Sequence, residues 1–118
     1  MANEILIKNY LAGAAIAARR IVKFDTTDGT VIQAAAAADL SVGVCGEVGP
    51  ASGERCDVIQ QGIAEVDFGG TVARGAMVTA DANGKAVAAA STNRTIGIAL
   101  VSAVSGDIAP VLIAPSVM

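Results

Sequence analysis

The side chains of this sequence that could do chemistry are carboxylates, one lysine in a turn and two cysteines. Glu65 and Asp67 alternate along one segment, and Asp25 and Asp28 share one turn. Paired carboxylates can serve acid–base catalysis or hold Ca²⁺. No segment has the dense, alternating oxygen ligands of a calcium loop, and aspartate is common in turns. We therefore interpret these carboxylates as turn residues and a solvated strand face, and we expect no metal site.

The sequence also lacks the parts of a nucleophilic active site. It contains no histidine, which is the usual general base, and no Gly-x-Ser-x-Gly motif. The glycine-rich run Gly43-x-x-Gly46-x-x-Gly49 has neither the lysine nor the following helix of a phosphate-binding loop. We expect a protein that is not an enzyme and that holds no cofactor.

Lys85 follows Asn83-Gly84, a strong hairpin signal. Lipoyl and biotinyl carrier domains are small β proteins that present their prosthetic group on a lysine at a hairpin tip. The neighbours in Gly84-Lys85-Ala86 do not reproduce the pattern of those domains. A carrier or scaffolding domain of a cellular complex is therefore the alternative hypothesis, and an ordinary exposed lysine is favoured.

Cys45 and Cys56 lie eleven positions apart on either side of a glycine-rich connection. Two cysteines do not make a disulfide framework, and they lack the clustered partners of a zinc site. Two buried thiols that act as small apolar residues are the favoured interpretation. A disulfide formed after release into an oxidising medium stays open as the alternative.

Composition limits the partners of the protein. The 118 residues carry a formal net charge of −3, and the sequence pI is about 4.7. Nucleic-acid binding is not expected, because it needs clustered Lys and Arg and aromatic stacking platforms, and the only aromatic residues are Tyr10, Phe24 and Phe68. The apolar stretch from Ile5 to Ile16 is interrupted by Lys8 and is too short to span a membrane. We expect a soluble protein made in a reducing cytoplasm.

The elements that must position these residues are strands. Val and Ile together number 25 against 5 Leu, and there are 13 Gly, which is typical of β structure. Short apolar runs alternate with turn signals every 8–12 residues, as in an all-β sandwich or small antiparallel barrel. Apolar and polar or small residues alternate over residues 62–68, which predicts a half-buried strand. The Ala34–Ala38 run is expected to be a flat loop after a strand rather than a helical turn. Pro110 predicts that the last strand lies at an edge or contains a bulge.

The sequence contains an internal similarity between residues 21–59 and 76–113, at an offset that falls from 55 to 53 positions. The matched positions are Gly29 with Gly84, Val42-Gly43-Val44 with Ile96-Gly97-Ile98, Ser52-Gly53-Glu54 with Ser105-Gly106-Asp107, and Val58 with Val111. We predict one domain, residues 1–118, in which an N-terminal arm or first strand (1–19) precedes two pseudo-equivalent duplicated β units (20–60 and 75–113).

The second unit resembles the small capsid decoration (cement) proteins of tailed bacteriophages. The resemblance lies in Arg74-Gly75-Ala-Met-Val, the Asp81-Ala-Asn-Gly84-Lys85 hairpin, Ile96-Gly97-Ile-Ala-Leu100 and the Ser105-Gly106-Asp107 turn. It covers residues 62–114 well and 20–60 more loosely. It implies a compact β fold and homo-oligomers, dimers or trimers, on the outer capsid surface of the virion. There they bridge neighbouring major capsid protein subunits against internal pressure.

The N-terminal segment is the candidate contact with a partner. It precedes the duplicated units and alternates poorly for a core strand. We expect it to form an arm or edge strand that pairs with a neighbouring capsid or cement subunit, in the strand-addition mode of recognition. Its residues are Ala2, Asn3, Glu4, Ile5, Leu6, Ile7, Lys8, Asn9 and Tyr10.

Overall fold

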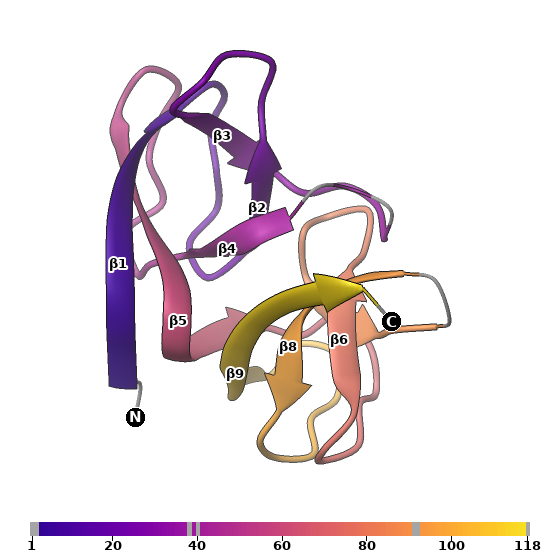
Figure 1. The fold of residues 1–118 in the computed structure, drawn as a ribbon. Helices are drawn as coiled ribbons and strands as arrows, with labels where there is room; N and C mark the ends of the chain where they lie inside the picture. Colours follow the sequence, from indigo (N-terminus) through magenta and orange to yellow (C-terminus); the bar gives the residue numbers. More distant parts are fainter. Residues whose placement is uncertain (1–2, 38, 40, 91–92, 118) are drawn as a thin grey trace.

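The computed structural model describes residues 3–37, 39, 41–90 and 93–117, and the strands in this part form one continuous sheet (Figure 1). The strands are β1 (Asn3–Ala12), β2 (Ile21–Phe24), β3 (Thr30–Gln33), β4 (Ser41–Cys45), β5 (Arg55–Asp67), β6 (Met77–Ala80), β7 (Ala86–Ala88), β8 (Arg94–Ala99) and β9 (Ile108–Val117). Their order in the sheet is β1-β3-β2-β4-β5-β9-β8-β6-β7, and β1 also pairs with β5. This extra pairing closes a five-stranded barrel, so the predicted all-β fold is confirmed.

The two halves of the chain have the same strand order. The first half runs β3-β2-β4-β5 across the sheet, and the second runs β7-β6-β8-β9. Four backbone hydrogen bonds of the first half have an equivalent in the second half. In the first half, the N–H groups donate to the C=O groups as Ala12 to Glu54, Gly53 to Ala12, Gly13 to Val31 and Cys45 to Arg20. Their equivalents in the second half, in the same order, are Phe68 to Asp107, Gly106 to Phe68, Gly69 to Ala86 and Ala99 to Ala76. This equivalence begins at Ala12 and Phe68, upstream of the ranges 20–60 and 75–113. Duplication of the sequence itself stays a prediction.

Strand β5 belongs to both halves. Its residues 55–63 pair with β1, and its residues 62–67 pair with β9. Gly62 has a φ of +95°, a backbone conformation that favours glycine, and Figure 1 shows β5 bending sharply along its length. The sequence pattern predicts two separate strands here, one from Cys56 to Gln60 and one over residues 62–68. The structure joins them, because the bend at Gly62 lets one strand pass from the first half into the second.

The interior is divided into two apolar clusters. One fills the first barrel, and its residues are Tyr10, Ala12, Ile16, Val22, Val31, Val42, Cys45, Cys56 and Val58. The other packs the second half against the outer side of that barrel, and its larger members include Ile21, Val44, Ile59, Val66, Phe68, Val72, Val78, Ile96, Val111 and Ile113. Neighbours Val58 and Ile59 belong to different clusters because successive strand residues point to opposite faces.

Two local expectations have different outcomes. The run from Ala34 continues from β3 as a loop without helix through Ala37, as expected, and Ala38 lies outside the described residues. The Asp39 carboxylate accepts hydrogen bonds from the N–H groups of Ala35 and Ala36. Of the two placements predicted from Pro110, an edge and a bulge, the edge is wrong, because β9 lies between β5 and β8. The β8–β9 pairing does contain a register shift, between Thr95 and Gly97, away from Pro110. Proline is tolerated here because it lies just beyond the last β8–β9 pair, Ala99 with Val111, and its carbonyl still accepts from Leu100 N–H.

Glycine lets strands approach closely at equivalent places in the two halves. A methyl group added at Gly97 would overlap the carbonyl oxygen of Leu112, and one added at Gly43 would overlap that of Ile59. Both neighbours are backbone atoms of the adjacent strand, which cannot move without disturbing its ladder. Gly43 and Gly97 therefore set the spacing between β4 and β5 and between β8 and β9.

We predict that Gly97→Ala lowers the free energy of unfolding by about 1–3 kcal/mol, the range for overpacking a tight interior. Urea unfolding followed by circular dichroism measures the change. Gly46→Ala is the matched control, because its added methyl group would meet its nearest neighbour, the Asp57 carbonyl oxygen, at an ordinary 3.8 Å. Equal stability of the two variants would contradict the close-approach argument.

Candidate functional site

The structure places the candidate partner-binding segment inside the barrel wall. Residues Asn3–Tyr10 form most of β1, and they pair antiparallel with β5 from Asn3 opposite Ile63 to Tyr10 opposite Cys56. Ala2 lies outside the described residues. In this chain the segment is therefore a strand of its own barrel, held along one edge.

The other edge of β1 is open over most of its length. β3 pairs with β1 only at Leu11 and Ala12. Within the described part of the chain, no strand pairs with that edge from Asn3 to Tyr10. In Figure 1, β1 forms the left border of the molecule. Open edges are usually protected in proteins, because they pair readily with other chains.

The hydrogen bonds of Leu11 and Ala12 show which N–H and C=O groups of β1 point toward the open edge. Ala12 N–H donates to Glu54 on the β5 side, whereas Leu11 N–H donates to Gly29 on the β3 side. Because N–H and C=O groups alternate in direction along a strand, and the β1–β5 register is regular from Ile7 onward, Ile7 and Asn9 point theirs away from β5. These two residues present a short ladder of unpaired donors and acceptors.

The side chains beside this edge are apolar and exposed. Leu6, Ile7 and Leu11 are 44%, 51% and 40% exposed. Tyr10 differs from them, since its ring is buried in the barrel and its hydroxyl accepts a hydrogen bond of 2.9 Å from Gln60 Nε2. We define the β1 edge surface as the edge backbone of Ile7 and Asn9 together with the side chains of Leu6, Ile7 and Leu11.

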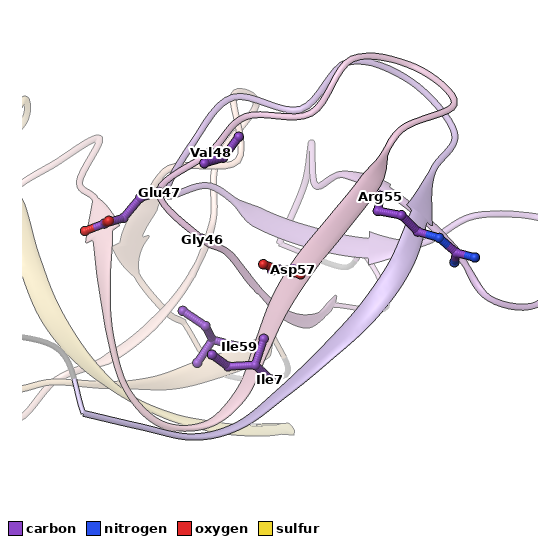
Figure 2. A pocket seen from close by; sticks show the side chains of 7 residues that line it. All are labelled: Ile7, Gly46, Glu47, Val48, Arg55, Asp57 and Ile59. Carbon is purple, nitrogen blue, oxygen red and sulfur yellow. The ribbon is translucent and has the colours of Figure 1, made fainter.

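A hollow of about 510 Å³ adjoins the β1 edge surface (Figure 2). Ile7 and Ile59 are opposite each other in the β1–β5 ladder and lie side by side in the floor. The loop after β4 forms a wall. The complete lining is Ile7, Gly46, Glu47, Val48, Arg55, Asp57 and Ile59.

Charges of both signs surround this apolar floor. The Asp57 carboxylate accepts a hydrogen bond from Asn9 Nδ2, and Glu47 forms a 3.7 Å ion pair with Arg19. Val48 is 80% exposed, a high value for a large apolar side chain. None of the seven lining residues forms a nucleophile–base pair. The arrangement suits an apolar side chain of a partner, with polar contacts at the rim.

Sequence reasoning missed a second exposed apolar group on β9. Ile108 and Leu112 are 50% and 40% exposed, and they alternate with the buried Ala109, Val111 and Ile113. Leu112 is opposite Ile63 on β5. Alternation alone could have placed these residues on one face, but it could not show that nothing in the described part of the chain covers that face.

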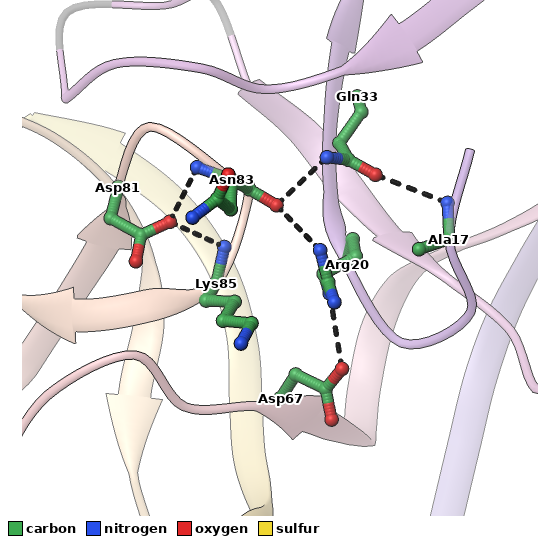
Figure 3. Close-up of polar contacts among 7 residues, drawn as sticks. All are labelled: Ala17, Arg20, Gln33, Asp67, Asp81, Asn83 and Lys85. Carbon is green, nitrogen blue, oxygen red and sulfur yellow. Dashed lines mark hydrogen bonds and ion pairs between the residues drawn. The ribbon is translucent and has the colours of Figure 1, made fainter. Parts of the chain in front are cut away.

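Lys85 is not at a projecting hairpin tip (Figure 3). The carbonyl oxygen of Asn83 accepts hydrogen bonds from Arg20 Nη1 at 2.9 Å and from Gln33 Nε2 at 2.8 Å. Gly84 O accepts from Ile21 N–H at 2.8 Å, so the β6–β7 turn is docked on the first barrel. A carrier lysine needs a free tip to reach its partners, and this geometry does not supply one.

The acidic pairs have structural contacts. Asp67 forms a 3.0 Å ion pair with Arg20, and Asp25 Oδ1 accepts from Thr26 N–H in its turn. Among the described residues, no group of three or more His, Cys, Asp and Glu side chains could hold a metal ion. No helix in the same part of the chain has the length and apolar character to cross a membrane.

Comparison with known proteins identifies the family to which this chain belongs. A search of curated proteins finds no match. Among solved structures, the N base of head fiber gp8.5 in bacteriophage phi29 has 18% identity and a TM-score of 0.70, covering 96% of this chain and 97% of that one. At this identity the likeness shows a shared fold. A family model described as phage cement protein matches residues 3–113, so the chain belongs to the phage cement protein family and is a phage structural protein.

Proposed function

We propose that this protein binds the outer surface of a phage capsid as a homo-oligomer, a dimer or a trimer, and cements neighbouring subunits of the major capsid protein against internal pressure. The family match supports a role on the capsid. The observation that carries the mechanism is the open edge of β1 with its exposed Leu6, Ile7 and Leu11. The protein acts without catalysis, and it is made in the host cytoplasm before it joins the virion.

Residues Ala2–Tyr10 are the proposed contact, through strand addition. A strand from a neighbouring capsid or cement subunit pairs with the free N–H and C=O groups of Ile7 and Asn9. An apolar side chain of that subunit enters the hollow above Ile7 and Ile59. Each hydrogen bond adds only about 0.5–1.5 kcal/mol, but many copies on one particle act together.

The barrel makes this edge rigid. β1 is held by β5 over most of its length, and Tyr10 and Ala12 are anchored in the barrel interior. A preformed strand loses little conformational entropy when a partner pairs with it. Deleting residues 2–10 would remove Tyr10 from the core and strip β5 of its neighbour, so a test of the contact needs single substitutions.

We predict that Ile7→Pro weakens binding to capsids about tenfold or more and leaves the barrel folded. Proline removes an N–H that faces away from β5, so no bond within the chain is lost. Binding is measured by cosedimentation with shells of the parent phage that lack the protein. Circular dichroism and thermal unfolding report the fold.

Two matched variants separate the causes of this loss. Ile7→Ala keeps the N–H and removes most of the side chain from the hollow, so we expect weaker binding than wild type but stronger than Ile7→Pro. Lys8→Pro removes an N–H that faces β5, so it is expected to destabilise the barrel itself. Wild-type occupancy for Ile7→Pro would refute strand addition at this edge, and equal losses for Ile7→Pro and Ile7→Ala would assign binding to the side chain.

Cementing has its own test. Shells decorated with the protein should rupture at a higher temperature, and resist osmotic shock better, than undecorated shells, because added contacts between subunits must break before the shell opens. Electron microscopy and nuclease access to packaged DNA measure rupture. Unchanged rupture at full occupancy would show a bound protein that does not cement.

A further inference from the structure

The two cysteines meet inside the first barrel. Cys45 is the last residue of β4 and Cys56 is the second residue of β5. Their exposed fractions are 0% and 1%, and their Sγ atoms lie 3.7 Å apart. Both are free thiols in this structure. The proposed function does not use them.

The position of Cys45 at a strand end leaves room for the sulfur atoms to approach. Cys45 is opposite Val58 in the β4–β5 ladder, so Cys56 is its diagonal neighbour two residues away. The ladder ends at Cys45, and the connection of residues 46–54 follows. A disulfide has a sulfur–sulfur distance of about 2.05 Å, so the two atoms must approach by about 1.6 Å. Rotation of two short side chains and a small shift at the end of β4 supply such a movement.

The Cys45 thiol contacts the wall of the hollow. The Cys45 Sγ lies 3.5 Å from the carbonyl oxygen of Val48 and donates a weak hydrogen bond to it. Val48 and Gly46 line the hollow beside β1. A change at Cys45 therefore reaches the loop that walls the hollow.

We propose that Cys45 and Cys56 form an intramolecular disulfide when the protein leaves a reducing environment, and that this bond ties the end of β4 to the start of β5, the two strands that the 46–54 loop connects. The proposal goes beyond the proposed function, and it stands or falls independently of capsid binding.

The reaction is thiol–disulfide exchange with a small-molecule disulfide such as oxidised glutathione. Both thiols are buried in the folded barrel, so the oxidant reaches them while the chain is unfolded or locally open. Cys56 Sγ attacks the oxidant, forms a mixed disulfide and releases one glutathione thiolate. Cys45 then loses its proton, attacks the Cys56 sulfur and releases the second, so two protein thiols are oxidised while one glutathione disulfide is reduced to two thiols.

The bond would have two consequences. It closes a short loop between β4 and β5, which restricts the unfolded chain and raises the thermal unfolding temperature. It also removes the sulfhydryl proton of Cys45, so the hydrogen bond from Cys45 to the carbonyl oxygen of Val48 is lost.

The test is refolding of the full chain from urea in a glutathione redox buffer, which gives the buried thiols access to the oxidant. Alkylation in denaturant with and without prior reduction, followed by intact-mass measurement, counts the thiols. We expect a monomer that is lighter by two hydrogens, that reacts with alkylating agent only after reduction, and that unfolds at a temperature several degrees above that of the reduced form.

Cys45→Ser and Cys56→Ser are the matched controls. Each keeps a small polar group in place and removes one sulfur, so oxidation should leave the unfolding temperature of either variant unchanged. The proposal is overturned if the refolded wild-type chain keeps two free thiols, carries glutathione on one cysteine, or forms disulfide-linked dimers. A disulfide without any gain in unfolding temperature would overturn the stabilising link between β4 and β5.

Discussion

The structure depends on one strand that takes part in two β arrangements. The first part of β5 closes the barrel with β1, and its last part carries β9 and the second half of the sheet. The positive φ of Gly62 allows the change of direction between them. Because Val58 and Ile59 face opposite sides of this strand, each half obtains its own apolar cluster from one continuous ladder. A side chain at Gly62 would strain the bend on which both clusters depend.

Neighbouring strands pack closely because glycine lies where they approach each other. Gly43 and Gly97 bring neighbouring strands together in equivalent places, and Arg20 and Gln33 hold the β6–β7 turn against the first barrel. The result is a stiff body whose open features are shapes, namely the unpaired edge of β1 and the hollow beside it. The proposed role on the capsid needs surfaces that fit neighbouring subunits, and a rigid barrel would supply such surfaces.

Local patterns predicted much of the fold and only part of the candidate site. Asn83-Gly84 marked a turn, the alternation from Gly62 to Phe68 marked a strand, and the excess of Val and Ile indicated an all-β protein. Each of these signals depends on the conformational preferences of nearby residues. The edge expected from Pro110 is absent, since a proline just beyond the end of one ladder is tolerated even in a strand with neighbours on both sides. The docking of the Lys85 turn could not be predicted, because whether a turn projects or docks depends on residues fifty or more positions away.

The sequence by itself determined the class of fold, the positions of the turns and the family, because these follow from short-range periodicity, turn chemistry and motif order. The tertiary structure alone decided that residues 3–10 form a barrel strand with one open edge, and that Ile7 and Ile59 meet in the floor of a hollow. It also decided that Cys45 and Cys56 face each other. Strand register and barrel closure bring these residues together across separations of eleven to more than fifty positions, and no local preference encodes such pairings.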